Sequence, residues 1–452
     1  MRDKAFAALG DKNLADGKVA GKAPTYTITS RETYTEGDNP RIAKQIKGTY
    51  TVPCFLTKGC AAGGVMTYAK SKKGKFDSIP IQQGTMQAEF ICRIPRAALT
   101  SPARPSLYGH GLLGSPSEID AGNVDDMASE HNMMFCATPE IGMSNGDVFN
   151  AIRLLKDMSN FSSMADRLQQ GLLNELYLGR LMINAGGFPA SADFKNGAGA
   201  SVIDKSELYY DSNSQGGILG GALTALSPDF KRAVLGVVGM NYSVLLPRST
   251  DFKTYESVFK PAYASRLERT ILLTIIQNLW DRGENNGYAH HITNDPLKGT
   301  PKHQVLMHVA LGDHQVAQVS AENAARTIGA SGRFPAYDAG RSFDVTPLWS
   351  IPATTSANAK GSGLVIWDAG PCRISGILTA CLEDSVFDDA GGIGNPPAPI
   401  EAITPTMGRD PHSRPRSSPA ARQQKSDFLK PNGSIVNPCP VGRACRTSTW
   451  DY

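Results

Sequence analysis

The chain lacks a long hydrophobic run: no stretch of its 452 residues approaches the roughly 18 consecutive apolar residues that span a bilayer. It also lacks an excess of charge of one sign, because 46 basic and 42 acidic residues leave a formal net charge of +4. These charges are dispersed, so no basic stripe of the kind that binds a phosphate backbone is present. We therefore expect no transmembrane segment and no nucleic-acid partner.

The chain also begins without the apolar block of about 7 to 15 residues that a secretory signal needs. Its eight cysteines nevertheless favour an oxidising compartment, where disulfides persist. Three pairs lie close in sequence, in turns with Gly or Pro: Cys54 with Cys60, Cys372 with Cys381 and Cys439 with Cys445. We expect a secreted or periplasmic protein whose signal peptide is absent from this chain. The alternative is eight reduced, mostly buried thiols.

The pattern of the chain changes near Arg104. Before that point it is β-rich, with strand patterns at 47–57 and 84–95. Beyond it, short apolar strands alternate with helical patterns, which predicts an α/β fold with a mainly parallel central sheet covered on both faces. A helical stretch at about 240–302 interrupts this alternation. An insertion there would sit over the carboxyl edge of the sheet, where open α/β folds bind ligands.

The segment ELYYDSNSQGGILGG carries the most specific signal. An apolar strand ends at Tyr210, a tight turn follows, and a helix of small residues begins near Gly217. A nucleophile elbow needs this order, because it projects a serine hydroxyl from a strained turn with small residues two positions to either side. Ser214 has such neighbours in Ser212 and Gly216. Ser212 as the nucleophile would place the bulky Tyr210 in one of those positions, so we predict Ser214.

An acid and a histidine follow Ser214 in the chain order Ser, Asp, His. Asp313 ends the apolar strand HVALGD, where a carboxylate can orient an imidazole or simply cap the next helix. Of the two later histidines, His314 adjoins the acid and would point elsewhere. His412 lies in a loop ahead of a polar helix, and we predict that it is the general base.

The turn LYGHGLLGS supplies a candidate oxyanion hole, because a Gly-containing turn brings backbone N–H groups close to a developing negative charge. The predicted donors are an N–H near Leu112 or Leu113 and the N–H of Gln215, the residue after the nucleophile. The ring of His110, next to Gly111, is expected to fix the loop by hydrogen bonding and to take no part in proton transfer.

The elbow SNSQG, the HG turn, the acid in LGDHQV and the late His412 together resemble the α/β-hydrolase superfamily, across roughly residues 80–425. Within it they are most similar to secreted lipases and esterases. The resemblance implies a hydrolase domain at 80–425, with residues 240–302 as a cap-like helical insertion. It leaves a β-rich N-terminal extension at 1–79 and a cysteine-bearing tail at 426–452.

The resemblance also implies that the strands containing FICRIP and MMFCATP are neighbours, so that Cys92 and Cys136 would form a fourth disulfide. Two separately buried thiols are the alternative. The same resemblance places the acid after the penultimate strand, which favours Asp313. The long stretch between the last strand and His412 leaves Asp368 as a rival acid.

Other polar clusters are weaker candidates. His290 and His291 resemble metal ligands in type, but we expect no metal site there. Asp120, Asp125 and Asp126 lack the loop pattern of a calcium site and suit a solvated helix start. The glycine run after Ser214 has no Lys and no phosphate-loop spacing, so no nucleotide and no other cofactor is expected.

The predicted reaction is hydrolysis of a carboxylic ester through an acyl-enzyme intermediate, with a Ser-His-Asp triad. An amidase or peptidase would use the same groups, and a non-catalytic binding module on a hydrolase scaffold is a further alternative. The ester substrate can be a small molecule or a polymer, and the sequence sets no oligomeric state.

Overall fold

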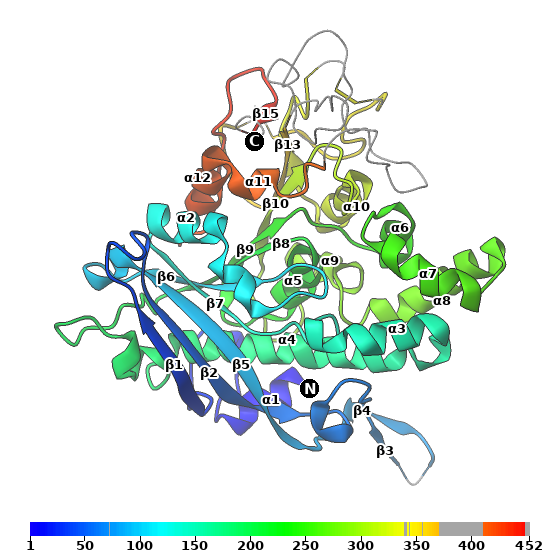
Figure 1. Ribbon diagram of the computed structural model, residues 1–452, viewed down its shortest axis with the longest axis horizontal. Helices are drawn as coiled ribbons and strands as arrows, with labels where there is room; N and C mark the ends of the chain where they lie inside the picture. Colours follow the sequence, from blue (N-terminus) through cyan, green and yellow to red (C-terminus); the bar gives the residue numbers. More distant parts are fainter. Residues whose placement is uncertain (72, 339–340, 343, 355, 370–409, 448–452) are drawn as a thin grey trace.

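The computed structural model describes residues 1–452 except 72, 339–340, 343, 355, 370–409 and 448–452. Its centre is an 11-stranded sheet (Figure 1). In spatial order the strands are β1 (Tyr26–Thr33), β2 (Ile42–Cys54), β5 (Gly84–Pro95), β7 (Met133–Ala137), β6 (Arg104–Gly109), β8 (Leu208–Asn213), β9 (Phe230–Gly236), β10 (Gln304–Ala310), β13 (Gly363–Asp368) and β11 (Ser331–Gly332). The short β15 (Cys445–Arg446) pairs with β13.

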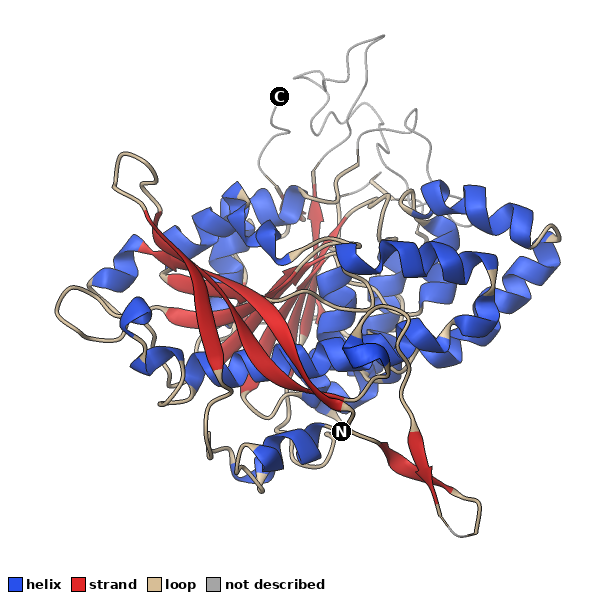
Figure 2. Cartoon of the chain, turned by 60° about the horizontal axis from the view of Figure 1, so that its bottom comes forward, coloured by secondary structure: helices blue, strands red, loops and turns tan. Residues whose placement is uncertain are grey.

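The sheet is antiparallel at one end and parallel through the rest. β1, β2, β5 and β7 pair antiparallel with one another, and every pair from β7 to β11 is parallel. The prediction of a mainly parallel central sheet is therefore confirmed. β2 and β5 contain most of the strand patterns predicted at 47–57 and 84–95, so these two strands of the β-rich N-terminal region extend the central sheet (Figure 2).

Helices cover both faces of the sheet (Figure 1). One face packs against α1 (Arg2–Ala8), α4 (Ser162–Ile183), α5 (Gln215–Leu226), α9 (Ala289–Thr293) and α10 (Gln318–Ile328), and the other against α2 (Gly122–His131) and α12 (Pro419–Phe428). The short α11 (Arg414–Ser417) precedes α12. Two small two-stranded sheets are separate from the central one: β3 (Tyr68–Lys70) with β4 (Phe76–Pro80), and β12 (Asn358–Ala359) with β14 (Ile435–Val436).

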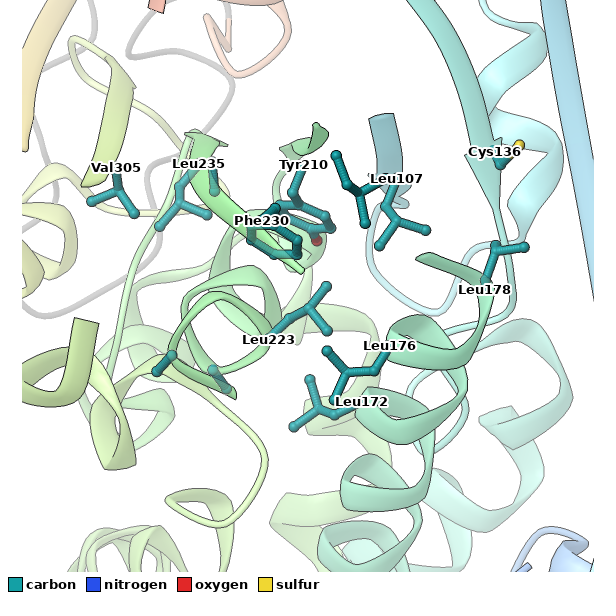
Figure 3. Close-up of a cluster of buried hydrophobic side chains, with 14 of the residues drawn as sticks. Leu107, Cys136, Leu172, Leu176, Leu178, Tyr210, Leu223, Phe230, Leu235 and Val305 are labelled. Atoms are coloured by element: carbon teal, nitrogen blue, oxygen red, sulfur yellow. The ribbon is translucent and has the colours of Figure 1, made fainter. Parts of the chain in front are cut away.

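The largest hydrophobic core lies between the sheet and helices α4 and α5 (Figure 3). Leu107 and Tyr210, on the neighbouring strands β6 and β8, contribute to this core together with Leu223 of α5 and Leu176 of α4. Because successive strand residues point to opposite faces, Tyr108 belongs instead to the core against α2 and α12. Burying a leucine fully is worth about 1.5–3 kcal/mol, so this packing fixes the strands that carry the site.

The predicted helical stretch at 240–302 contains α6 (Tyr242–Leu245), α7 (Phe252–Ala262), α8 (Arg266–Trp280) and α9. Together with α3 (Val148–Lys156) and part of α4, helices α6 to α8 enclose a third apolar cluster. In Figure 1 they lie beside the end of the sheet at which α5 begins. In the part of the chain that the structure describes, no helix combines the length and the apolar character that crossing a membrane requires.

Three disulfides are present among the described residues. Cys92 and Cys136 face each other across β5 and β7 with their Cα atoms 4.1 Å apart, as the neighbouring strands predict. The sequence-close pairs Cys54 with Cys60 and Cys439 with Cys445 are also bonded. The predicted pair Cys372 with Cys381 lies outside the described residues.

Candidate active site

Ser214 occupies the turn between β8 and α5, at the point where the sequence predicts a nucleophile. Its backbone has φ 62° and ψ −125°, a conformation that non-glycine residues rarely adopt. Small neighbours make this turn possible, because a side chain on Gly216 would overlap the backbone of Gly109 at the end of β6. The alternative nucleophile, Ser212, is fully buried and donates its hydroxyl to Val234 O at 3.0 Å. The geometry therefore favours Ser214.

Asp313 and His412 are in direct contact although 99 residues separate them. The Nδ1–H of His412 donates to the two carboxylate oxygens of Asp313, at 2.9 and 2.8 Å. Asp313 follows β10 and also accepts the backbone N–H groups of Gln315 and Val316, at 2.8 and 2.9 Å. These bonds hold the carboxylate in place, so the imidazole is presented with Nδ1 protonated and Nε2 able to accept a proton.

The charge around His412 favours its protonated form. Burial lowers the pKa of His412, but the carboxylate of Asp313 raises it by charge and by hydrogen bonding, and the net shift is upward from the ordinary value. Asp410 adds to this effect, whereas the cation of Arg416 opposes it. A raised pKa makes the imidazole a stronger base toward a serine hydroxyl.

Asp410 is a part of the site that the sequence analysis missed. Its carboxylate accepts the N–H of His412 at 3.1 Å, the N–H of His314 at 3.2 Å and the side-chain amide of Gln315 at 2.8 Å. It therefore joins the loop after β10 to the loop that carries the histidine. Only its position two residues before His412 could have pointed to it.

The rival acid Asp368 is bound elsewhere. It ends β13, where its carboxylate oxygens accept from the Nε and Nη2 of Arg341 at 2.7 and 2.8 Å. His314 is buried, and its backbone N–H and O hold the loop, the oxygen accepting from Thr250 N at 2.9 Å. The structure thus brings Asp313 to His412, and Asp368 to Arg341.

Ser214 and His412 line one cleft of about 550 Å³. Its walls also include Leu112 of the HG turn and the ion pair of Glu118 with Arg416, whose Oε1 and Nη1 are 2.7 Å apart. The cleft is predominantly polar, with hydroxyl, amide and carboxylate groups among its lining residues. A substrate bound in this cleft would therefore be in a space lined by both the predicted nucleophile and the predicted base.

The HG turn is fixed beside Ser214 by hydrogen bonds. His110 O accepts from Gly216 N at 2.9 Å, which ties the turn to the start of α5. The ring of His110 hydrogen-bonds to backbone, through Nδ1 to Gly111 O at 2.9 Å and from Glu140 N to Nε2 at 3.0 Å, and its Nδ1 lies 3.7 Å from Glu140 Oε2. These bonds hold the loop around His110, and its supporting role stays a prediction. Glu118 accepts the N–H of Gly111 at 2.6 Å.

The three predicted oxyanion-hole residues differ in what their N–H groups do. The N–H of Leu113 donates to the side-chain oxygen of Gln215 at 3.1 Å, so it is already engaged. Within the described part of the chain, the N–H groups of Leu112 and Gln215 donate to no protein acceptor. Leu112 and Gln215 are therefore better candidates than Leu113 to bind an oxyanion.

The side chain of Gln215 and the buried acid Glu140 form a network behind this hole that sequence reasoning missed. The Gln215 amide donates to Glu140 Oε2 at 2.8 Å and to Met143 O at 2.9 Å. Burial raises the pKa of Glu140 to about 7. No local sequence pattern marks this contact, because it joins the residues after β7 to the start of α5.

A second, apolar chamber also opens at Ser214. It runs between the HG turn and helices α3, α4, α6, α7 and α8, and its walls are almost entirely hydrocarbon. Leu154, Phe161, Ile276 and Trp280 are among the lining side chains. The predicted insertion at 240–302 therefore contributes directly to the surroundings of the nucleophile.

The weaker candidates have other surroundings. Asp120 and Asp125 bond to Arg93, and Asp126 bonds to Arg41 at 2.5 Å, so these acids form an ion-pair network. His290 and His291 cluster with Asp295, an acid four positions after His291 that the sequence analysis did not include. This group could offer three ligand atoms to a cation, but its members are exposed or half-buried and it lies outside the cleft.

The sheet order, the strained serine turn, and the acid after β10 paired with a histidine after β13 define the α/β-hydrolase fold. Neither a protein-family model nor a curated protein sequence matches the chain. Solved structures that resemble it include acetyl xylan esterase 1 from Thermoanaerobacterium sp., with 13% identity, a TM-score of 0.42 and coverage of 68% of this chain and 78% of that one. The S-formylglutathione hydrolase from Agrobacterium tumefaciens has 12% identity, a TM-score of 0.34 and coverage of 76% and 91%.

Proposed function

We propose that the protein is a serine hydrolase that cleaves carboxylic esters through an acyl-enzyme intermediate. The single observation that carries this proposal is that His412, hydrogen-bonded to Asp313, lines one cleft with Ser214 on its strained turn. A serine hydroxyl alone is a weak nucleophile, and an adjacent histidine held in one tautomer by a carboxylate activates it.

In the proposed reaction His412 Nε2 takes the proton of Ser214 as Oγ attacks the ester carbonyl. The N–H groups of Leu112 and Gln215 bind the oxyanion. The bond from carbon to the alcohol oxygen then breaks, and His412 returns the proton to that oxygen. Water, activated by the same imidazole, releases the acid and restores Ser214.

A fluorophosphonate probe tests the proposal directly, because it labels only a serine that a working base activates. We expect one adduct, on the peptide containing Ser214, and neither labelling nor ester turnover in Ser214→Ala. Ser212→Ala is the matched control, and labelling there should persist because the Ser212 hydroxyl is occupied by Val234 O. A folded wild-type protein that takes no label would instead support a binding module on a hydrolase scaffold.

Ester specificity is part of the proposal, since an amidase would use the same groups. Turnover of a matched ester and amide of one acyl group decides between them. A larger kcat/KM for the amide would make the protein an amidase or peptidase with the same triad.

We also propose that the protein works in an oxidising compartment. The disulfides in the described part of the chain support this, because such bonds are rare where glutathione keeps thiols reduced. Alkylation of the unreduced protein followed by peptide mass mapping is the test. Alkyl label on Cys92 and Cys136 would remove the support.

A further inference from the structure

The apolar chamber and the polar cleft meet at Ser214, and they differ in which other groups of the site they contain. Ser214, Leu112, Asp251, Tyr255 and Gln315 line both spaces. His412 lines the polar cleft and is absent from the lining of the apolar chamber. An ester bound at Ser214 therefore has one half in each space.

The position of the histidine decides which half goes where. In ester hydrolysis the alcohol oxygen must receive a proton as the carbon–oxygen bond breaks, and the group that donates it must lie within hydrogen-bond reach. His412 is that group in the proposed function. The leaving alcohol consequently occupies the polar cleft, and the acyl chain is directed into the apolar chamber.

The apolar chamber is too long for an acetyl group alone. Its lining extends from Ser214 to Phe161 of the segment before α4 and to Trp280 at the end of α8. Two carbons attached to Ser214 cannot contact all of these walls. Each further methylene group buried against them should raise kcat/KM about fourfold, until the chamber is filled.

The polar cleft contains a carboxylate that makes no side-chain hydrogen bond or ion pair with the described residues. Asp251, at the start of α7, receives no side-chain hydrogen bond or ion pair from any described residue, and its own N–H is bound by Ser249 Oγ at 3.2 Å. Burial raises its pKa, with Asp410 and Asp313 acting in the same direction and His412 against it. A half-buried carboxylate is costly to leave without a hydrogen-bond donor, so a donor on the ligand is its natural partner.

We propose that the substrate is an ester of an aliphatic acyl chain longer than acetyl with a polyol, and that Asp251 accepts a hydrogen bond from a free hydroxyl of that polyol. Thr250, Thr254 and Ser413 add hydroxyl groups to the same cleft, which suits a leaving group with several hydroxyls. This inference rests on the proposed function, since it assigns the two halves of the ester by the role of His412.

The acyl half is tested with nitrophenyl acetate and nitrophenyl octanoate. We expect the wild-type kcat/KM to be at least tenfold higher for the octanoate. Ala151→Trp fills the chamber from α3, and it should lower the octanoate-to-acetate ratio at least tenfold. Ala8→Trp, at the exposed end of α1, is the matched control and should leave the ratio as in the wild type. An acetate preference in the wild type would overturn the acyl assignment.

The alcohol half is tested with octanoylglycerol, ethyl octanoate and octanoylcholine, which share one acyl chain. Asp251→Ala should lower the ratio of kcat/KM for octanoylglycerol over ethyl octanoate at least tenfold, the usual scale for a hydrogen bond to a charged group. Asp77→Ala, on the exposed hairpin strand β4, is the control and should not change it. An unchanged ratio in Asp251→Ala would contradict the proposal that the alcohol is a polyol bound by Asp251. A larger loss of kcat/KM for octanoylcholine than for octanoylglycerol would contradict it as well.

Fluorophosphonate labelling separates these outcomes from failure of the proposed function. A protein that labels at Ser214 and hydrolyses esters without the two preferences is a serine esterase with other specificity. A protein that takes no label and hydrolyses none of these esters is not the enzyme proposed above.

Discussion

At the scale of single residues, the choice between two buried acids is the sharpest question in the site. Asp313 contacts the ring of His412, and Asp368 contacts Arg341. Asp313→Asn replaces a carboxylate acceptor with an amide whose nitrogen is a donor. The imidazole of His412 is then no longer held in the tautomer with Nδ1 protonated. We expect kcat to fall by about 10⁴, the scale of the same change in a serine protease.

Asp368→Asn is the matched control for that prediction. It breaks a buried ion pair and should lower stability, because it leaves Arg341 with a weaker partner. Activity per folded molecule, measured after correction by active-site titration, should fall less than tenfold. A larger loss of activity in Asp368→Asn than in Asp313→Asn would identify Asp368 as the catalytic acid.

The pH dependence of kcat/KM follows from the same contacts. Burial lowers the pKa of His412, yet Asp313 and Asp410 raise it to a net value above the ordinary 6.5. The base must be neutral, so activity should decline as pH falls, with a midpoint above 6.5 in the wild type. In Asp313→Asn the carboxylate that raises the pKa of His412 is lost, while burial still lowers this pKa. The midpoint of the residual activity should therefore move to lower pH. A midpoint that stays in place would mean that another group limits the reaction.

At the scale of secondary-structure elements, the elbow depends on a close approach of α5 to the end of β6. A Cβ on Gly216 would lie 2.7 Å from Gly109 Cα and closer still to the adjoining carbonyl, and neither backbone can yield without moving Ser214. Gly216→Ala should therefore lower stability by about 1–3 kcal/mol and kcat at least tenfold. Gly197→Ala places its Cβ in open space and serves as the control. Thermal unfolding and ester turnover measure both variants, and equal effects would contradict the argument.

The elbow was predictable because its determinants lie within about ten residues of sequence. Strand, turn and helix around Ser214 follow one another directly, and the need for small neighbours can be read from the SNSQG letters. The pattern of the chain likewise placed β5 and β10. β5 alternates between exposed and buried residues over much of its length, and β10 is a short apolar run that is buried nearly throughout.

The groups that were not predicted all depend on contacts between distant segments. Glu140 accepts a hydrogen bond from Gln215, 75 positions away, and Asp251, the residue before α7, lines the same cleft as Ser214 and His412. Their residue types are ordinary in loops, so no spacing distinguishes them from solvated acids. The hydrogen bond of the Leu113 N–H also depends on a distant segment, because its acceptor is the side chain of Gln215.

At the scale of the whole molecule, the first strands of the chain are part of the scaffold that carries the site. β2 pairs with β5 along twelve register positions, and β5 pairs with β7, whose other neighbour β6 leads into the HG turn. The disulfide between Cys92 and Cys136 links β5 covalently to β7. The N-terminal region therefore supports the oxyanion loop indirectly, through continuous backbone hydrogen bonding.

This long-range disulfide should contribute more to stability than the short one near the N-terminus. Crosslinking removes freedom from the unfolded chain, and the effect grows with the logarithm of the closed loop. Cys92 and Cys136 are 44 positions apart, and Cys54 and Cys60 only 6. All four side chains are buried, so the cavities left by alanine are alike. We expect Cys92→Ala with Cys136→Ala to cost about 4 kcal/mol, and Cys54→Ala with Cys60→Ala about 1.5 kcal/mol less, in guanidinium unfolding. Equal losses would show that strain or packing, and not chain entropy, sets the contribution of these bonds.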